Sequence, residues 1–344
     1  MNRPADLQLT GIHHVSNITA DARGNLDFYT RALGMRLVKK TVNQDDTSVY
    51  HLFYADAEGT PGTDVTFFDI PQAGANHPGS GEVNEIALRV SGTDALAWWQ
   101  ERFDRFGISH GQIETRDGRS LLRFTDPEGQ RLALLDDADA SIPGGTPWAR
   151  ATVPQQYGIR GLGSIRLATA VPEATLHVLT ELLGFRVVDD RAAGSNGQRR
   201  SIRLESGQGG PNGTVYVEVT PEAPRARLGR GGVHHVAFRV PTFEAHEAWQ
   251  RYLSDAGMAV TPVIDRFYFR SIYFREPGGV LYELATDEPG FATDEPLETL
   301  GESLALPPFL EGQRAQIEAR LTPLDSSPAI TTTEYVPHQP SVAP

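Results

Sequence analysis

The sequence predicts an α+β fold in which one unit, a strand, a helix and three further strands, occurs four times in tandem. Three observations support this prediction: four amphipathic helix patterns that each stop at a glycine, a strand-like run before each helix, and a turn before the last strand of each unit. The four glycines stand 73, 77 and 73 residues apart, which is the regular spacing of a repeat. The 344 residues therefore contain four βαβββ modules followed by a tail.

The helices are predicted where apolar residues recur with the helical period. They are expected over Asn25–Leu33, Ala95–Phe106, Pro172–Leu183 and Glu244–Ala256, which are followed by Gly34, Gly107, Gly184 and Gly257. Glycine just past a helix supplies the left-handed backbone conformation that closes the C-terminus. Each helix is therefore expected to end next to its glycine.

The strands are predicted from alternation and from β-branched residues. The first strands are expected over Gly11–Thr19, Val83–Val90, Leu162–Ala168 and Val233–Val240. The last strand of each module follows a turn, at Gly59–Gly62, Asp126–Gly129, Gly210–Gly213 and Glu276–Gly279.

The order of the modules predicts three parts of the chain. Residues 1–150 are expected to form an N-terminal domain of modules one and two, residues 151–290 a C-terminal domain of modules three and four, and residues 291–344 a C-terminal extension. The extension is predicted to be partly irregular, with one short helix over Gly312–Leu321 and a Pro-, Ser- and Thr-rich tail from Thr322.

Composition narrows the classes of function. Hydrophobic residues make up 39% and charged residues 22% of the chain, as in ordinary globular proteins. The formal net charge of -13 argues against nucleic acid and anionic membranes as partners. With no cysteine, the chain has neither thiolate metal ligands nor a cysteine nucleophile. No apolar run approaches the ~20 residues of a membrane helix, and Met1–Leu9 lacks a signal-peptide pattern, so we expect a cytoplasmic protein.

A His-His pair opens the first strand of modules one and four, within Gly11–Thr19 and Gly232–Val240. Neighbouring residues of a strand point to opposite faces, so alternation brings only one histidine of each pair to a common centre. A single pair is as often structural as functional. Its repetition at the same place in two modules favours a shared site.

Alignment of the modules on their glycines and turns tests this interpretation. The matching first-strand residues are His14, Glu85, Ser164 and His235, and the matching last-strand residues are Phe67, Ala133, Val217 and Glu283. A carboxylate among apolar residues is costly when unpaired, and a metal ion would offset that cost. The alternative is that Glu283 pairs with Arg239 or Arg266 and that the histidines are merely packed.

The candidate metal ligands are therefore His14, His235 and Glu283. Two imidazoles and one carboxylate leave several coordination positions open, as in non-haem Fe(II) oxygenases, where substrate and O₂ occupy them. The matching residues of modules two and three do not form such a set, so we expect that part of the protein to be filled and structural.

The repeated unit resembles the vicinal oxygen chelate superfamily, which includes glyoxalases, extradiol ring-cleaving dioxygenases and small drug-binding resistance proteins. The resemblance covers roughly residues 8–290 and implies that paired modules form two cup-like mixed sheets, with a metal in a cup. Many extradiol dioxygenases draw their first histidine from module three, where this chain has Ser164. A ligand from module one instead implies that modules one and four share a cup, as in the hydroquinone dioxygenases.

Further stretches are similar to the hydroquinone dioxygenases and to bacterial ring-cleaving dioxygenases of the methylhydroquinone type. They are Tyr50–Asp56, Gly59–Thr63, Gly232–Phe238, Asp265–Arg266, Ser271–Tyr273 and Gly278–Val280. This resemblance implies Fe(II), or Mn(II) with the same ligands, at His14, His235 and Glu283. The surrounding site residues that it implies are Tyr273, Arg266, His13, His234 and Ser16, the last a hydroxyl where the family can have threonine.

Each surrounding residue has a chemical role in this interpretation. Arg266 and Tyr273 would hold negative charge and the ring hydroxyl that the metal does not bind. His13 or His234 would move a proton, although simple alternation turns both away from the metal unless a bulge redirects them. The histidines without a partner pattern are predicted to be ordinary; they are His51, His77, His110, His177, His246 and His338.

The sequence and the resemblance together predict an Fe(II)-dependent dioxygenase that inserts O₂ into a substituted hydroquinone or a related aromatic diol. The expected partners are a small aromatic diol and O₂, without nucleic acid or membrane, and the sequence is compatible with a homo-oligomer. Two alternatives stay open: a glyoxalase-like isomerase or lyase, whose sites usually use more carboxylates, and a metal-free protein that binds a hydrophobic compound.

Overall fold

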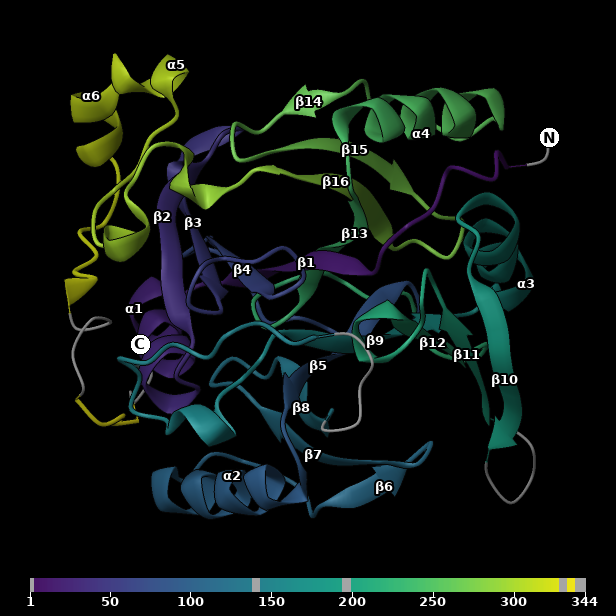
Figure 1. The fold of residues 1–344 in the computed structure, drawn as a ribbon, viewed down its shortest axis with the longest axis horizontal. Coiled ribbons are helices and arrows are strands. Elements are labelled where there is room, and N and C mark those ends of the chain that lie inside the picture. Colours follow the sequence, from purple (N-terminus) through teal and green to yellow (C-terminus); the bar gives the residue numbers. More distant parts are fainter. Residues whose placement is uncertain (1–2, 138–142, 194–198, 328–332, 338–344) are drawn as a thin grey trace.

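The computed structural model of the chain describes residues 3–137, 143–193, 199–327 and 333–337 (Figure 1). The predicted fold class is confirmed, because each of the four modules has the order βαβββ. Module one comprises β1 (Ile12–Thr19), α1 (Ala22–Asp27), β2 (Arg36–Asn43), β3 (Asp46–Ala55) and β4 (Asp64–Asp69). Module two comprises β5 (Glu82–Val90), α2 (Thr93–Phe106), β6 (Glu114–Arg116), β7 (Arg119–Thr125) and β8 (Arg131–Asp136). Module three comprises β9 (Leu162–Thr169), α3 (Pro172–His177), β10 (Arg186–Ala193), β11 (Arg199–Glu205) and β12 (Thr214–Val219). Module four comprises β13 (Val233–Val240), α4 (Phe243–Asp255), β14 (Ile264–Asp265), β15 (Phe269–Arg275) and β16 (Leu281–Pro289).

Each predicted helix is present and stops beside its glycine. The helices α1 and α3 are short because the chain continues from them into wider π-helical turns, Phe28–Ala32 and Val178–Leu182. The φ angles of Gly34, Gly107, Gly184 and Gly257 are 71°, 64°, 76° and 84°. These left-handed values confirm the predicted C-terminal caps. Within the described residues, no helix is both long and apolar enough to cross a membrane.

Sixteen strands of the described residues form two curled eight-stranded sheets. The strand orders are β14-β15-β16-β13-β1-β4-β3-β2 and β10-β11-β12-β9-β5-β8-β7-β6. Modules one and four therefore build one sheet, here named the 1/4 cup, and modules two and three build the 2/3 cup. The prediction that modules one and four share a cup is confirmed. Each cup combines strands from before and after residue 150, so the division into residues 1–150, 151–290 and 291–344 stays a prediction about order along the chain.

Helices cover the outer faces of the sheets. The helix α4 packs on β13, β15 and β16, and α2 packs on β7 and β8 (Figure 1). Trp249 of α4 and Trp99 of α2 are fully buried. Because the large apolar side chains of the helices lie outside, the inner face of each sheet remains available for a site.

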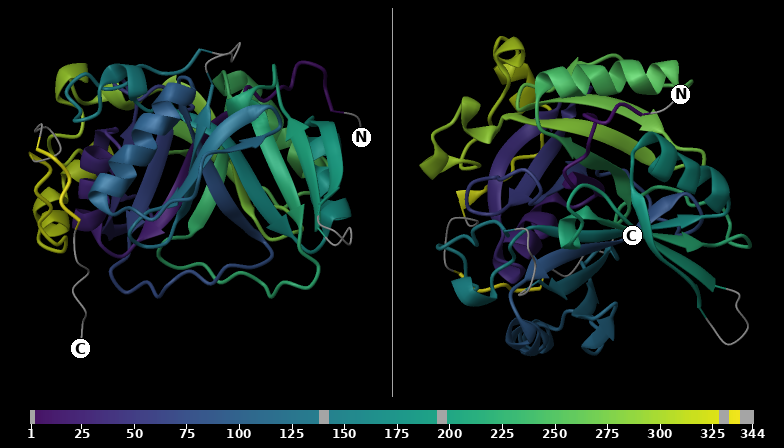
Figure 2. Two further views of the ribbon diagram at one scale, coloured as in Figure 1. Left: turned by 90° about the horizontal axis from the view of Figure 1, so that it is seen from below. Right: turned by 45° about the vertical axis from the view of Figure 1, so that its right-hand side comes forward.

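Two segments that connect successive modules lie side by side. Residues 70–81, between modules one and two, lie beside residues 220–232, between modules three and four (Figure 2). The backbone N–H of His77 donates to Arg227 over 2.9 Å, and that of Ala226 donates to Ser80 over 2.9 Å. These contacts hold together the two segments along which the chain passes from one cup to the other.

The C-terminal extension lies against the 1/4 cup beside β2 (Figure 1). It contains the short helices α5 (Pro308–Glu311) and α6 (Arg314–Glu318) and 3₁₀ turns at Phe291–Thr293 and Leu297–Thr299. The prediction of a short helix within Gly312–Leu321 is thus confirmed by α6. Residues 322–326 and 333–337 of the predicted irregular tail contain neither helix nor strand. Residues 328–332 and 338–344 of the tail, including His338, lie outside the described residues.

Two contacts fasten the extension to the cup. The buried Lys39 of β2 forms ion pairs with Asp294, at 2.8 Å, and with Glu295. Phe291 packs on Phe53 of β3 and on Tyr268, with ring centroids 5.0 Å and 5.7 Å apart. Because β3 belongs to module one and Tyr268 to module four, the extension joins both ends of the 1/4 cup.

Candidate metal centre and its cavity

The three predicted ligands lie on three adjacent strands of the 1/4 cup. His14 is on β1, His235 on β13 and Glu283 on β16. Ala237 pairs with His14 across one ladder and with Glu283 across the next. Paired residues share a face of the sheet, and so do residues two apart on one strand. His14, His235 and Glu283 therefore point to the same side.

The donor atoms of these residues form a small triangle. Nε2 of His14 lies 3.3 Å from Nε2 of His235, and Oε2 of Glu283 lies 3.2 Å and 2.9 Å from these two nitrogens. Three ligands about 2.1 Å from one ion and at right angles would lie about 3 Å apart. Among the described residues, this is the single group of three or more His, Cys, Asp or Glu side chains close enough to hold a metal ion.

Glu283 is fully buried. Ser271 donates a hydrogen bond to its Oε1, but Oε2 has no hydrogen bond of acceptable geometry, although two imidazole nitrogens lie nearby. The two nitrogens lie close to this oxygen without donating a hydrogen bond to it. Such an arrangement is expected when all three atoms bind one cation.

The predicted alternative, an ion pair of Glu283 with Arg239 or Arg266, is wrong. Nε of Arg239 lies 2.6 Å from Oδ1 of Asp287. Arg266 forms two hydrogen bonds to Asp45, of 3.1 Å and 2.8 Å. A buried carboxylate requires a compensating positive charge, and neither arginine supplies it. A metal ion fits this requirement.

Each candidate ligand histidine is held by the histidine before it in the chain. Nδ1 of His13 lies 2.9 Å from Nδ1 of His14, and Nδ1 of His234 lies 2.7 Å from Nδ1 of His235. Nε2 of His13 donates to the carbonyl oxygen of Thr286 over 3.1 Å. Burial lowers the pKa of His13 to about 3, so the neutral ring has a bare Nδ1 that accepts Nδ1–H of His14. The lone pair of His14 Nε2 then faces the centre, as a metal ligand requires.

The positions of His13 and His234 depart from simple alternation. The register of β1 on β13 shifts between Ile12 and His14, and a bulge of this kind is needed to turn His13 toward the centre. Bulges redirect side chains, and both histidines contact the ligand that follows them. His13 and His234 therefore lie beside the candidate ligands, whereas simple alternation predicted that both would face away.

A cavity of about 390 Å³ opens onto the centre from the inner face of the 1/4 cup. Of the five surrounding residues predicted from the sequence, Tyr273, Arg266 and His234 line it. The other two, His13 and Ser16, are buried behind its wall. The volume is within the usual range of small-molecule sites, and the wall combines aromatic side chains with a few polar groups.

Tyr273 lies across the β15–β16 ladder from Glu283, and its ring centroid is 5.7 Å from that of His235. Burial and the charge of Glu283 raise the pKa of Tyr273, so the phenol keeps its proton at neutral pH and can donate. The guanidinium of Arg266 lies 5.6 Å from the centre of the Tyr273 ring. These two residues provide hydrogen-bond donors on the side of the cavity formed by module four.

Arg266 also links the two modules at the edge of the cavity. Its carbonyl accepts a hydrogen bond of 2.8 Å from Gln44, next to Asp45 at the tip of the β2–β3 hairpin. The Asp45 side chain is 71% exposed. Water screens such an exposed ion pair, which contributes little to stability and can open at low cost.

Sequence reasoning missed three polar residues near the centre: Ser271, Thr66 and His51. Oγ of Ser16 lies 2.7 Å from Oγ1 of Thr66, and this Oγ1 lies 2.9 Å from Nε2 of His51. His51, predicted to be ordinary, in fact lines the cavity at the end of this hydroxyl chain.

A sequence signal for His51 was present. The stretch Tyr50–Asp56 is one of those that resemble the hydroquinone dioxygenases, and His51 shares a strand face with Phe53. Ser271 lies in another of these stretches, Ser271–Tyr273, whereas Thr66 gave no such signal, because its importance depends on which strand lies beside it.

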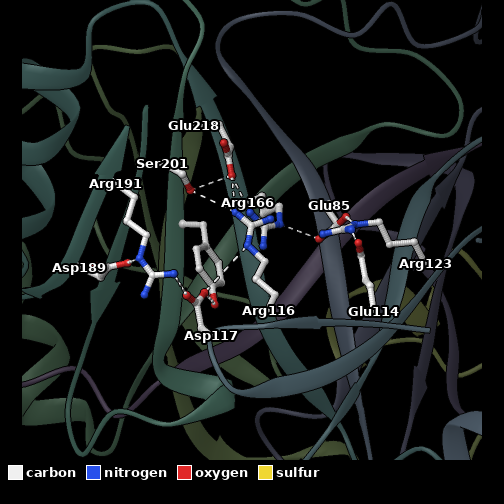
Figure 3. Close-up of polar contacts among 11 residues, drawn as sticks. Glu85, Glu114, Arg116, Asp117, Arg123, Arg166, Asp189, Arg191, Ser201 and Glu218 are labelled. Carbon is white, nitrogen blue, oxygen red and sulfur yellow. Dashed lines mark hydrogen bonds and ion pairs between the residues drawn. The ribbon is translucent and has the colours of Figure 1, made fainter. Parts of the chain in front are cut away.

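The 2/3 cup holds ion pairs where the 1/4 cup holds the candidate ligands. Glu85, at the matching first-strand position, accepts hydrogen bonds from Arg123 and Arg166, of 2.6 Å and 2.7 Å (Figure 3). Arg166 also donates to Glu218. Burial would raise the pKa of Glu85, but the two arginines lower it. The predicted filling of this cup is incomplete, because a cavity of about 170 Å³ remains beside Ser164 and Glu85.

The family model and the relatives that match this chain point to the same protein family. A model described as Glyoxalase/Bleomycin resistance protein/Dioxygenase superfamily matches residues 11–134 and 161–284. A Bacillus subtilis (strain 168) protein provisionally named ring-cleaving dioxygenase MhqA is 46% identical over 318 residues, which are 92% of this chain and 100% of that protein. The chlorohydroquinone/hydroquinone 1,2-dioxygenase of Sphingobium indicum is 31% identical over 319 residues, covering 90% of this chain and 95% of that enzyme.

Two solved structures show the same architecture. A provisionally assigned dioxygenase from Bacillus subtilis has a TM-score of 0.84 at 37% identity, covering 93% of this chain and 98% of that one. Glyoxalase I from Zea mays has a TM-score of 0.59 at 14% identity, covering 80% of this chain and 92% of that one. The second likeness concerns the fold alone.

Proposed function

The chain belongs to the Glyoxalase/Bleomycin resistance protein/Dioxygenase superfamily, and within it we propose that the chain is an Fe(II)-dependent dioxygenase that opens the ring of a substituted hydroquinone or a related aromatic diol. Relatives named as ring-cleaving dioxygenases, at 46% and 31% identity, support an oxygenase. The type of diol rests on the second of these relatives and on the cavity.

One observation carries this proposal. Nε2 of His14, Nε2 of His235 and Oε2 of Glu283 form a triangle with sides of 2.9 to 3.3 Å at the floor of an aromatic-lined cavity. Two neutral nitrogen donors and one carboxylate suit a divalent first-row metal and leave one side of it open to the cavity. A closed set with more carboxylates, as in glyoxalase-like sites, is not formed by the described residues.

The residues of the site would have different roles around the metal. His14, His235 and Glu283 would hold Fe(II), with Mn(II) as the alternative ion. When bound, the metal supplies open positions for the diol oxygen and O₂ and a route for electrons between them. Tyr273 would donate a hydrogen bond beside these positions, and Arg266 would stabilise negative charge there.

The test is oxygen consumption by protein reconstituted with Fe(II) without air. We expect about one metal ion per chain and O₂ uptake with hydroquinone that exceeds uptake with catechol by about tenfold, the discrimination that one lost buried hydrogen bond brings. Protein prepared with chelator should consume no O₂. The absence of uptake with every diol tested, despite bound metal, would contradict the proposal and favour the isomerase or the binding protein.

We propose a small aromatic diol and O₂ as the only partners of the site, and a location in the cytoplasm. A homo-oligomer is compatible with the proposal, and sedimentation of the purified protein would settle its assembly.

A further inference from the structure

His51 occupies a rigid position in the wall of the cavity. Its ring lies between those of Phe53 and Phe68, with centroids 4.0 Å and 4.2 Å away. Both phenylalanines also line the cavity, as His51 does. Two close aromatic neighbours restrict rotation of the imidazole, so its free edge keeps a fixed direction.

Only one of the two ring nitrogens of His51 is engaged. Nε2 lies 2.9 Å from Oγ1 of Thr66, while Nδ1 has no hydrogen-bond partner among the residues that the structure describes. Burial lowers the pKa of His51 well below its usual value, so at neutral pH the ring has one N–H and one bare nitrogen.

The hydrogen bonds between the hydroxyls of Ser16 and Thr66 and the ring of His51 can run in either direction. Thr66 and Ser16 lie 2.7 Å apart, and either hydroxyl can be the donor. If Thr66 donates to Nε2, then Nδ1 carries the hydrogen; if Thr66 accepts, then Nδ1 is bare. His51 can thus offer either a donor or an acceptor to a ligand without becoming charged.

The strand order places His51 away from the candidate ligands. From β1, which carries His14, the sheet continues through β4 to β3, which carries His51. Two strand spacings correspond to about 10 Å along the sheet, and curling of the cup shortens the direct path. Tyr273, in contrast, is the ladder neighbour of Glu283. His51 therefore places a polar group on the β3 wall, away from the ligands, and the other polar residues of the lining include Thr41, Asn43, Gln44, Asp45 and Thr261.

A para-diol needs this arrangement. Its two hydroxyls lie on opposite sides of the ring, so when one oxygen is at the metal the other points across the cavity. A catechol places both oxygens at the metal and leaves the opposite wall without a partner. Resting on the proposed function, we infer that His51 binds, through Nδ1, the second hydroxyl of the hydroquinone and so determines the preference for para-diols.

Two conservative variants separate the two nitrogens of the ring. The amide of asparagine reaches about as far as imidazole Nδ1, and the amide of glutamine about as far as Nε2. His51→Gln is therefore expected to reduce kcat/KM for hydroquinone about tenfold while leaving catechol within about twofold, since one buried hydrogen bond is lost. His51→Asn should retain more of the hydroquinone preference than His51→Gln. His177→Gln, on the exposed surface of α3, is the control and should change neither rate.

A second measurement does not depend on turnover. In the absence of O₂, calorimetry compares binding of hydroquinone and of phenol, which lacks the second hydroxyl, to the metal-loaded protein. The wild-type protein is expected to bind hydroquinone about tenfold more tightly than phenol, and His51→Gln should bind both equally.

The outcomes distinguish this inference from the proposed function. If no diol supports O₂ uptake, the proposed function fails, and the calorimetric comparison still decides whether His51 holds the second hydroxyl. If the wild-type enzyme prefers hydroquinone and His51→Gln keeps that preference, the assignment to His51 is overturned. It is also overturned if Tyr273→Phe, rather than His51→Gln, removes the preference, because the second hydroxyl would then lie at Tyr273.

Discussion

Glu283→Gln is expected to lose bound metal and nearly all turnover while the fold remains. The amide keeps the size of the carboxyl group but removes the charge that faces His14 and His235. Loss of residues that merely support metal ligands costs about 10- to 100-fold in affinity, so loss of a ligand charge should exceed that. Metal analysis after dialysis and O₂ uptake measure the effect. Full activity in this variant would make the carboxylate structural.

Glu276→Gln is the matched control for this variant. Glu276 is also buried, but it accepts backbone N–H groups of Gly278 and Val280, at 2.8 Å and 2.9 Å, and the hydroxyl of Thr175. This substitution should lower stability by about 1–3 kcal/mol without loss of metal, because it weakens hydrogen bonds to a charged acceptor. Glu283→Gln should instead lose metal while the stability of the metal-free protein changes little, since in that form no cation compensates the buried charge that the substitution removes.

A single substitution, Phe291→Ala, is expected both to destabilise the protein and to weaken substrate binding. Phe291 is 5% exposed and packs on Phe53 and Tyr268, which both line the cavity. Truncation of a buried phenylalanine typically costs about 3–5 kcal/mol. Denaturation in urea measures the stability, and the KM for hydroquinone reports on the cavity wall.

Phe309→Ala provides the comparison within the same extension. Phe309 is 59% exposed, so its truncation should change stability by no more than about 0.5 kcal/mol. If the two variants behave alike, the extension does not support the cup through Phe291. If Phe291→Ala lowers stability but leaves KM unchanged, the extension stabilises the cup without shaping its cavity.

The repeat carried most of the prediction from sequence. Glycines at regular spacing, first strands and turn prolines located the modules, and the same landmarks aligned His14, His235 and Glu283. These patterns are local and periodic, so they survive without knowledge of the tertiary structure. The shared cup of modules one and four came from the resemblance and from the absence of a histidine at Ser164.

What escaped prediction depends on contacts between distant segments. The hydroxyl chain from Ser16 through Thr66 to His51 requires that β1, β4 and β3 lie in that order, which a single sequence does not reveal. The ion pair of Arg266 with Asp45 joins residues of two modules across the cavity. The extension has no periodic pattern, so its place against β2 was equally hidden.

The pairing of the first module with the last has a consequence for synthesis of the protein. Glu283 follows His14 by 269 residues, and at about 5–20 residues per second the ribosome needs roughly 15 to 50 s to reach it. Until Val240 completes β13, β1 lacks this neighbour in the centre of the sheet, whereas modules two and three can complete their own sheet once β12 ends at Val219. During synthesis the first module therefore has an exposed strand edge. A chain released before Glu283 is made lacks a candidate ligand and cannot form the complete metal site.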